Sequence, residues 1–428
     1  MNMQRTEKLP PQRVPVAIIG GGQAGLSMSW HLKNAGIAHV VFERKRCFSE
    51  WRDARWDSFC LVTPNWQCRL PGFHYAGKDP NGFMLREQIV EYLDAYIDSF
   101  DPPVLEGVEV THIQRNDAGD FSLKTSAGDF IAQQVVMANG VYQVPIIPRS
   151  AERLPSHILQ LHSSNYRNPQ SMPAGATLVV GSGQSGCQIA EDLHLAGRQA
   201  HLCVGRAPRS PRIYRGREVT DWLTESGYYD IPYENHPQKA TVREKTNHYL
   251  TGRDGGREID LRQRALEGMK LYGLFKGVED SRFLFEADLT RNLADADRSY
   301  NNIRELVDRH IADQGIEAPL EPPYKPAWTP EFDPIELDFV KANITSIVWA
   351  IGFTPDYRWA DLPVFNGRGQ PVQRRGVTPV PGVYFLGLSW QNTWGSGRFA
   401  DVGKDAEYLL THIKSLNKLS QGEMPKMI

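Results

Sequence analysis

An apolar run near the start of the chain, residues 16–19, leads directly into a glycine turn and then into a helical pattern. Three glycines have the G-x-G-x-x-G spacing. The first makes a tight turn, the second lets the backbone approach a pyrophosphate, and the third lets the helix pack on the strand. The N–H groups and positive dipole end of such a helix attract phosphate. The segment therefore predicts a dinucleotide-binding turn, made by Gly20, Gly22, Gln23, Ala24 and Gly25.

An acidic residue ends the next predicted strand, residues 39–42. Glu43 stands about 18 residues after Gly25, close to the roughly 20 at which an acid reaches the ribose hydroxyls of a bound dinucleotide. We interpret Glu43 as a ribose ligand and place the adjacent Arg44 in the same nucleotide site. The alternative is a solvated charge at the end of a strand.

A second fingerprint follows residues 178–180, and it is again followed by a helical pattern. It comprises Gly181, Gly183 and Gly186, with Gln184 and Ser185 inside the turn. Two such motifs, each after a strand and before a helix, are far more specific than one.

No acid follows the next strand of the second unit, residues 200–204. Arg206 stands there instead, about 20 residues after Gly186, with Arg209 and Arg212 behind it. An arginine at this place suits the 2′-phosphate of NADP(H), so we assign Arg206 and Arg209 to that nucleotide. The alternative is an exposed basic loop.

Length and composition limit the number of domains and the kinds of partner and location that we expect for the protein. With 428 residues, 41% of them hydrophobic, the chain is expected to fold into two or three domains. A formal net charge of −2 argues against nucleic acid as a partner. The apolar runs are too short for a membrane helix, and residues 1–15 lack a secretory core, so we expect a cytoplasmic protein. None of the five cysteines forms a C-x-x-C pair, which removes the usual redox dithiol or zinc knuckle, and no metal is expected.

Two strand ends rich in small residues indicate how the units are connected. Residues 130–137 form the last strand of a predicted β-meander and run into Ala138-Asn139-Gly140, and a strand at residues 344–350 runs into Gly352. These ends would bracket an inserted domain. We predict an α/β fold with two Rossmann-like dinucleotide-binding domains, the second inserted into the first, with boundaries at 1–150, 151–330 and 331–428.

The last predicted helix is preceded by small residues at 395–397, followed by Arg398 and Phe399. A helix N-terminus of this kind is a second anion site, and in a flavoprotein it can face the electron-rich edge of the flavin. The alternative is an ordinary helix cap.

Taken together, these motifs resemble the class B flavin-dependent monooxygenases, and most of all the plant indole-3-pyruvate monooxygenases. The matching pieces are residues 20–25, 51–64, 139–140, 162–166, 181–186 and 350–356. The resemblance is weakest at 214–330. The family's hallmark residues are replaced by Ser156 and Ile158, and its asparagine in the second fingerprint is Gln184. These departures favour heteroatom oxygenation or oxidative decarboxylation over ester formation.

The resemblance implies FAD at the first fingerprint and NADPH at the second. NADPH would reduce the flavin, and a C4a-hydroperoxide formed with O2 would oxygenate a small nucleophile or oxo acid. Trp51 and Thr63 are placed at the flavin, although Trp51 also fits a core aromatic. Asn65 and Gln184 are candidate catalytic amides, although Asn65 also fits a turn residue after Pro64.

His162 is interpreted as a hinge residue that holds backbone. The substrate pocket is expected largely from residues 214–330 and 51–66. The sequence leaves the oligomeric state open, including a homo-oligomer. Two other functions stay open as well: an NADPH-dependent flavoprotein reductase without productive oxygen chemistry, and a non-catalytic nucleotide-binding protein.

Overall fold

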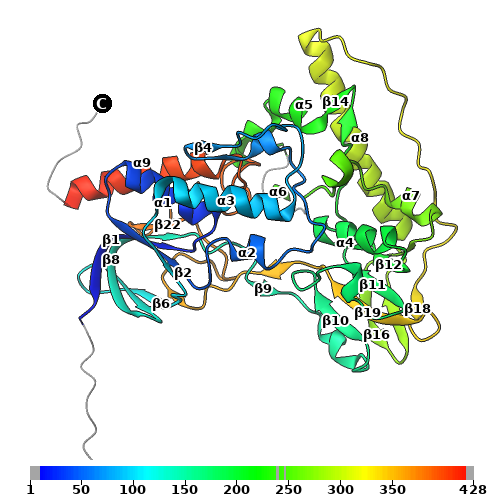
Figure 1. Cartoon of the computed structure of the whole chain (residues 1–428), viewed down its shortest axis with the longest axis horizontal. Coiled ribbons are helices and arrows are strands. Elements are labelled where there is room, and N and C mark those ends of the chain that lie inside the picture. Colours follow the sequence, from blue (N-terminus) through cyan, green and yellow to red (C-terminus); the bar gives the residue numbers. More distant parts are fainter. Residues whose placement is uncertain (1–9, 238–240, 245–246, 421–428) are drawn as a thin grey trace, which may run out of the picture.

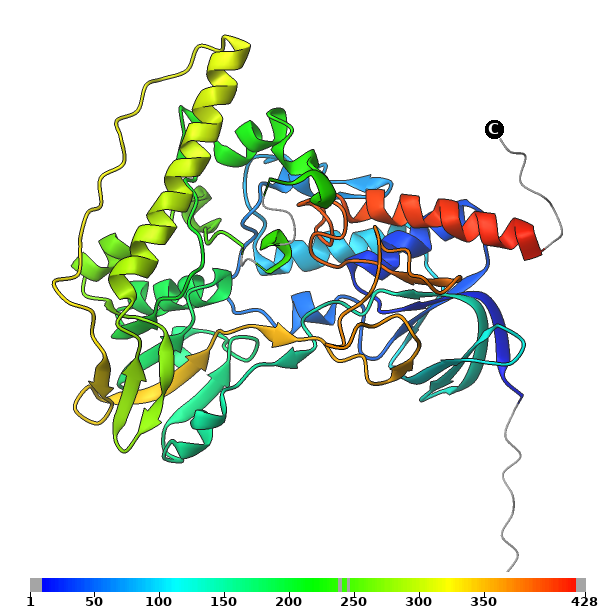
Figure 2. The same cartoon turned by 180° about the vertical axis from the view of Figure 1, so that it is seen from behind.

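The computed structural model describes residues 10–237, 241–244 and 247–420. It contains two α/β domains side by side, each built on its own sheet (Figure 1). The view from behind shows the same separation, with the last helix on the first domain and the longest helix on the second (Figure 2). The predicted α/β architecture is confirmed.

The first domain is built on an eight-stranded sheet in the order β21-β6-β7-β8-β1-β2-β5, with β22 also pairing β8. β1, β2, β5, β8 and β22 run parallel, whereas β6, β7 and β8 form the predicted antiparallel meander. The strands are β1 (Gln12–Ile19), β2 (His39–Glu43), β5 (Val104–Glu106), β6 (Val110–Arg115), β7 (Phe121–Thr125), β8 (Gly128–Met137), β21 (Ala360–Asp361) and β22 (Val383–Phe385).

Alternate residues of β1 supply the two faces of this sheet. Val16 and Ile18 pack against α1 (Gln23–Asn34), α3 (Arg86–Phe100) and α9 (Val402–Ser420). Ala17 and Ile19 pack on the opposite face, against the meander and the segment around residue 360. The minor elements of this domain are α2 (Ser49–Arg52), β3 (Arg69–Leu70) and β4 (Phe73–His74). Consequently, the carboxyl end of β1 delivers the glycine turn to the edge where α1 begins.

The second domain has a five-stranded parallel sheet in the order β10-β19-β11-β12-β15. One face is covered by α4 (Gln184–Leu195), α7 (Leu261–Leu266) and the start of α8 (Leu289–Gln314). A small antiparallel sheet covers the other face. The strands of the two sheets are β10 (Leu159–His162), β11 (Ala176–Val180), β12 (Ala200–Cys203), β15 (Lys270–Tyr272), β19 (Ile344–Trp349), and β16 (Phe275–Glu279), β17 (Arg282–Phe285), β18 (Glu336–Asp338).

The chain passes between the domains at one antiparallel pair, β9 (Val144–Pro145) with β20 (Phe353–Thr354). β9 lies between the two sheets in Figure 1. The predicted insertion is therefore confirmed, but its second boundary at residue 330 is wrong. β19 pairs with β10 and β11, so the second domain extends to about residue 352. Residues 319–330, just before the predicted boundary, form a largely exposed segment without helix or strand that precedes β18.

The described residues of 214–330 contribute α7, β15, β16, β17 and the start of α8 to the second domain and also form a helical insertion. α5 (Val219–Glu225) packs on the far half of α8 through Trp222, Leu223, Val307 and Ile311. The smaller elements are β13 (Ile213–Tyr214), β14 (Arg217–Glu218) and α6 (Thr241–Glu244). Figure 1 shows α8 extending beyond the sheet, with α5 beside it. Within the described residues, no helix combines the length and apolarity that crossing a membrane requires.

His201 makes the second domain sensitive to acid. It lies buried on β12, with Nδ1 2.9 Å from the hydroxyl of Tyr272. Burial, with Lys270 nearby, lowers its pKa from 6.5 to about 4. The unfolded chain takes up this proton near pH 6.5, so the stabilisation is complete above that pH and is lost as pH falls towards 4.

We expect about 2 kcal/mol less stability at pH 5 than at pH 7 from the protonation of His201. Urea unfolding of wild type and His201→Gln at both pH values measures it; equal pH dependence in the two proteins would contradict the assignment.

Candidate functional site

The first fingerprint has the geometry that the sequence predicts. Gly20 has φ +114°, and a Cβ there would lie 2.4 Å from the carbonyl oxygen of Ala138. A Cβ on Gly25 would lie 1.9 Å from the carbonyl oxygen of Gly20, so helix and strand pack too closely for a side chain. At Gly22 a Cβ would meet nothing within 4 Å, and α1 begins there without a side-chain cap. This open turn with uncapped N–H groups fits a pyrophosphate.

Glu43 lies at the mouth of the same turn. Its Oε2 accepts a hydrogen bond from the backbone N–H of Gly21 at 2.7 Å, and its Oε1 accepts one from Lys45 at 2.8 Å. Each carboxylate oxygen keeps further acceptor capacity. The side chain is therefore oriented by backbone beside the predicted ribose position, whereas Arg44 is exposed.

Three of the predicted flavin-site residues, from distant parts of the sequence, meet beside this turn. Gln23 accepts a hydrogen bond from Nε1 of Trp51 at 3.2 Å and donates one to the carbonyl oxygen of Gly397 at 3.1 Å. The ring of Trp51 stacks on Phe399, with centroids 5.1 Å apart and an interplanar angle of 27°. The segment before α9 is thereby fixed against the start of α1.

The second fingerprint repeats the geometry of the first. Gly181 has φ +104°, and a Cβ there would lie 2.7 Å from the carbonyl oxygen of Ala350. A Cβ on Gly186 would lie 1.8 Å from the carbonyl oxygen of Gly181. α4 begins at Gly183, again without a side-chain cap, and Ser185 lies half-buried in its first turn. The second turn therefore also fits a pyrophosphate.

Arg206 lies at the surface just beyond the end of β12. It is exposed and makes no hydrogen bond or ion pair with any residue that the structure describes. It also lines a cavity that Gln184, in the second fingerprint, reaches. A free guanidinium at this position fits the 2′-phosphate of NADP(H).

The predicted assignment of Arg209 to NADP(H) is wrong, because this side chain is not available to a nucleotide. Its guanidinium is buried, and it forms ion pairs at 3.1, 3.4 and 3.0 Å with Glu258, Asp260 and Asp297. It also donates a hydrogen bond to the hydroxyl of Tyr324 at 2.8 Å. Every direction from this guanidinium is occupied by protein, so its role is structural.

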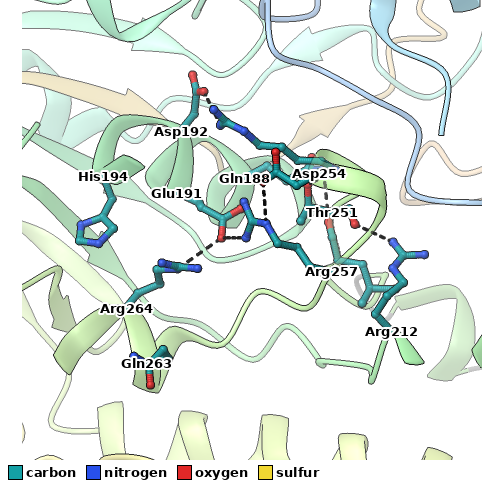
Figure 3. A network of polar contacts seen from close by, with 12 residues as sticks. Gln188, Glu191, Asp192, His194, Arg212, Thr251, Asp254, Arg257, Gln263 and Arg264 are labelled. Carbon is teal, nitrogen blue, oxygen red and sulfur yellow. Dashed lines mark hydrogen bonds and ion pairs between the residues drawn. The ribbon is translucent and has the colours of Figure 1, made fainter. Parts of the chain in front are cut away.

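Arg212 is likewise buried and holds backbone instead of phosphate. It donates to the carbonyl oxygens of Val62 in the first domain and Thr251 in the second, each at 2.9 Å. Figure 3 shows the polar network that includes this contact. In it, Glu191 of α4 pairs with Arg257 at 2.6 Å and with Arg264 at 3.3 Å. This network holds the segment around residues 250–257 against α4.

The two candidate catalytic amides are both engaged with backbone. Asn65 is buried, donates to the carbonyl oxygen of Asp79 at 2.9 Å and accepts from the N–H of Met84 at 2.7 Å, which favours its alternative role as a turn residue. The Gln184 amide donates to the carbonyl oxygen of Leu250 and accepts from its N–H. Both amides are therefore held by backbone groups in this arrangement.

His162 has the hinge contacts expected of it. Its Nε2 lies 3.1 Å from the carbonyl oxygen of Gly352, and its Nδ1 lies 2.9 Å from Oγ of Ser164. Its ring also meets Phe353 edge-on, with centroids 4.6 Å apart. Burial lowers the pKa of His162, which favours the neutral ring. His162 and Gly352 therefore hold the crossing between the domains, and Gly352 lies at this connection.

A cavity of about 910 Å³ lies between the two domains. Its walls come from α5, the described residues between Tyr228 and Leu250, and α8 on the second domain, and from Val62, Thr63 and the segment before α9 on the first. The cavity is lined mainly by residues from 214–330, where the substrate pocket was expected, and from 51–66 only by Val62 and Thr63. The aromatic residues Tyr228, Tyr229, Trp390 and Trp394 were not singled out in the sequence, because no spacing rule connects them.

Comparison with known proteins agrees with this geometry. Residues 17–225 match the family model described as pyridine nucleotide-disulphide oxidoreductase. An uncharacterized oxidoreductase described as CzcO-like, from Geobacillus kaustophilus, is 32% identical over 403 residues, which cover 94% of this chain and 98% of that protein. The similarity to the plant enzymes covers a smaller part of the chain than expected. Indole-3-pyruvate monooxygenase YUCCA6 from Arabidopsis thaliana is 29% identical over 208 residues, 45% of this chain and 49% of that protein.

The structure is also similar to that of a flavin-containing monooxygenase from Stenotrophomonas maltophilia. The TM-score is 0.64 at 18% sequence identity, over 95% of this chain and 99% of that one. The chain therefore belongs to the family of the CzcO-like oxidoreductases and has the two-domain fold of the class B flavin-dependent monooxygenases.

Proposed function

We propose that the protein is an FAD-dependent, NADPH-using monooxygenase that oxygenates a small nucleophile or an oxo acid. The observation that carries the proposal is the pair of uncapped fingerprint turns, one beside Glu43 and the other beside Arg206. The cavity between the domains reaches the second turn directly, because Gln184 and Arg206 line it. On the other side its wall includes Arg398, next to the Phe399 that stacks on Trp51.

Each turn has a distinct task in this proposal. The first would hold FAD, with pyrophosphate on the N–H groups of α1 and ribose on Glu43. The second would hold NADPH, with pyrophosphate on α4 and the 2′-phosphate on Arg206. Bound flavin supplies hydride acceptance and oxygen activation, and the protein supplies positioning and exclusion of water. Gln184 acts here by positioning residue 250 at the cavity wall.

The competing function is a reductase that passes electrons onward without using oxygen. All five cysteines are buried and unpaired, so the chain offers no accessible dithiol for such a transfer. Incubation with NADPH, ¹⁸O2 and a panel of amines, thioethers and oxo acids separates the two. The proposal predicts product carrying one ¹⁸O atom or, for an oxo acid, labelled carboxylate with release of CO2. NADPH consumption that yields only hydrogen peroxide or a reduced acceptor across the panel would favour the reductase.

Arg206→Ala tests the nucleotide assignment. We expect the KM for NADPH to rise about 10- to 100-fold, the value of one or two charge-assisted hydrogen bonds, while the KM for NADH stays unchanged. Arg298→Ala is the matched control, because Arg298 lines the same cavity but pairs with Asp295 at 2.7 Å. Equal losses for both nucleotides in Arg206→Ala would remove Arg206 from the 2′-phosphate site.

A further inference from the structure

Four arginines line the cavity between the domains, and one of them is unlike the others. Arg206, Arg298 and Arg309 are exposed. Water can solvate these three guanidinium groups, and Arg298 also has an acidic partner. Arg398 is half-buried in the wall formed by the segment before α9.

Arg398 has polar partners but no counter-ion. One NH2 group donates to Oδ1 of Asn247 at 2.7 Å, and the other donates to the carbonyl oxygen of Trp394. Within the described part of the chain no carboxylate pairs with it, and the nearby Asp401 is held by Lys404 at 2.8 Å. Burial lowers the pKa of this guanidinium, yet arginine stays charged in proteins. A partly desolvated cation without an anion is costly, and an anionic ligand would offset that cost.

The guanidinium of Arg398 is also held in place. Its Cζ lies 4.2 Å from the ring centroid of Trp394, and the ring of Tyr229 stacks on the same indole at 3.9 Å and 18°. Both groups pack on the Trp394 indole, and this packing limits the positions open to the guanidinium. A cation fixed in advance loses less entropy when it binds an anion.

The wall at α5 and α8 is mixed: α8 presents charged side chains such as Arg298 and Glu305, and apolar side chains lie among them. Val219 and Leu223 of α5 and Ile303 and Leu306 of α8 line the cavity. These side chains favour a hydrocarbon body, whereas Arg398 favours a negative charge at one end. The cavity is thus suited to an amphipathic organic anion.

We propose that this cavity binds an organic carboxylate, with the carboxylate on Arg398 and the apolar body against α5 and α8. The inference rests on the proposed monooxygenase function and names its substrate class. Two of the five N–H donors of Arg398 are accounted for by Trp394 and Asn247, which leaves donors for a carboxylate. Arg398 is assigned to this ligand instead of to flavin because its side chain reaches Asn247 of the second domain. The backbone carbonyl of Gly397 faces the flavin domain at Gln23.

Calorimetric titration of the purified, FAD-loaded protein in the presence of NADP⁺ tests the proposal with matched probes. 4-Phenylbutanoate and 4-phenylbutanamide have the same body and differ in charge. We expect the carboxylate to bind at least about 10-fold more tightly than the amide, the value of a charge-assisted pair, and the ratio to fall towards one in Arg398→Gln. Arg309→Gln is the matched control, since Arg309 lines the same cavity but is exposed, and should keep the ratio.

Three results would overturn the inference: no carboxylate preference in wild type, the same preference in Arg398→Gln, or loss of FAD from that variant with the ratio unchanged in the reloaded protein. If Arg398→Gln does not fold, Arg398→Lys keeps the charge without the planar fork and should lower the ratio about 3-fold or more. Binding needs no turnover. A protein that prefers the carboxylate yet forms no oxygenated product therefore contradicts the proposed function alone, and oxygenation without the preference contradicts this inference alone.

Discussion

Gly22→Asp is expected to abolish FAD binding while the first domain stays folded. Gly22 precedes α1 with extended backbone (φ −85°, ψ −174°), and a Cβ there would meet nothing within 4 Å. Aspartate is a favourable N-cap residue, so the apoprotein should be as stable as wild type or slightly more stable. The new carboxylate would occupy the position that a pyrophosphate needs and repel it. At about 4 Å and intermediate dielectric this repulsion weakens binding about 100-fold or more.

The matched control for this variant is Gly36→Asp, beyond the other end of the same helix. Gly36 has φ +68°, a conformation that aspartate tolerates, and a Cβ there also meets nothing within 4 Å. This variant should keep its flavin. Absorbance at the flavin bands after gel filtration, together with the far-UV circular dichroism spectrum, measures both. A yellow Gly22→Asp protein would show that the first turn does not hold the pyrophosphate.

Arg209→Met is expected to destabilise the second domain by about 3–5 kcal/mol, because it leaves buried carboxylates without their cation. Glu258, Asp260 and Asp297 all pair with this guanidinium. Asp297 keeps a second partner in Arg262 at 2.7 Å, which limits the loss. Urea unfolding followed by tryptophan fluorescence measures the change.

The structural role of Arg209 also predicts what should not change. Where Arg209→Met is still folded, its KM for NADPH should equal that of wild type. Arg291→Met is the control on α8, because its side chain is 61% exposed and its pair with Asp288 should contribute less than about 1 kcal/mol. A stable Arg209→Met protein with a greatly raised KM for NADPH would return Arg209 to the nucleotide site.

The parts of the fold that the sequence predicted are those with local signals. In each turn the third glycine lies against the carbonyl oxygen of the first, five residues earlier, so the spacing alone locates the turns at Gly20 and Gly181. Three strand-like runs separated by glycine-containing turns located the meander at β6, β7 and β8. The second domain boundary was missed because parallel pairing of β19 with β11 joins residues far apart in the sequence, and no local pattern records it.

The candidate site likewise contains residues that local sequence signals identify and residues whose surroundings only the tertiary fold determines. Arg206 and Arg209 are three residues apart and look equivalent in the sequence, yet one is exposed and the other is buried. The difference depends on acids at 258–297, which only the tertiary fold brings to Arg209. The sequence left Asn65 open between a catalytic amide and a turn residue for a related reason, because its amide partners at residues 79 and 84 lie in a loop whose path has no sequence signature.

Anaerobic titration of the purified protein with NADPH and, separately, with NADH tests the two-nucleotide assignment most directly. We expect the purified protein to carry one FAD per chain and to release it on denaturation. The flavin band should bleach with one equivalent of NADPH and much more slowly with NADH. A protein that retains no flavin, or one whose flavin NADH reduces as readily as NADPH, would contradict the assignment of FAD to the turn at Gly20 and of NADPH to the turn at Gly181 with Arg206.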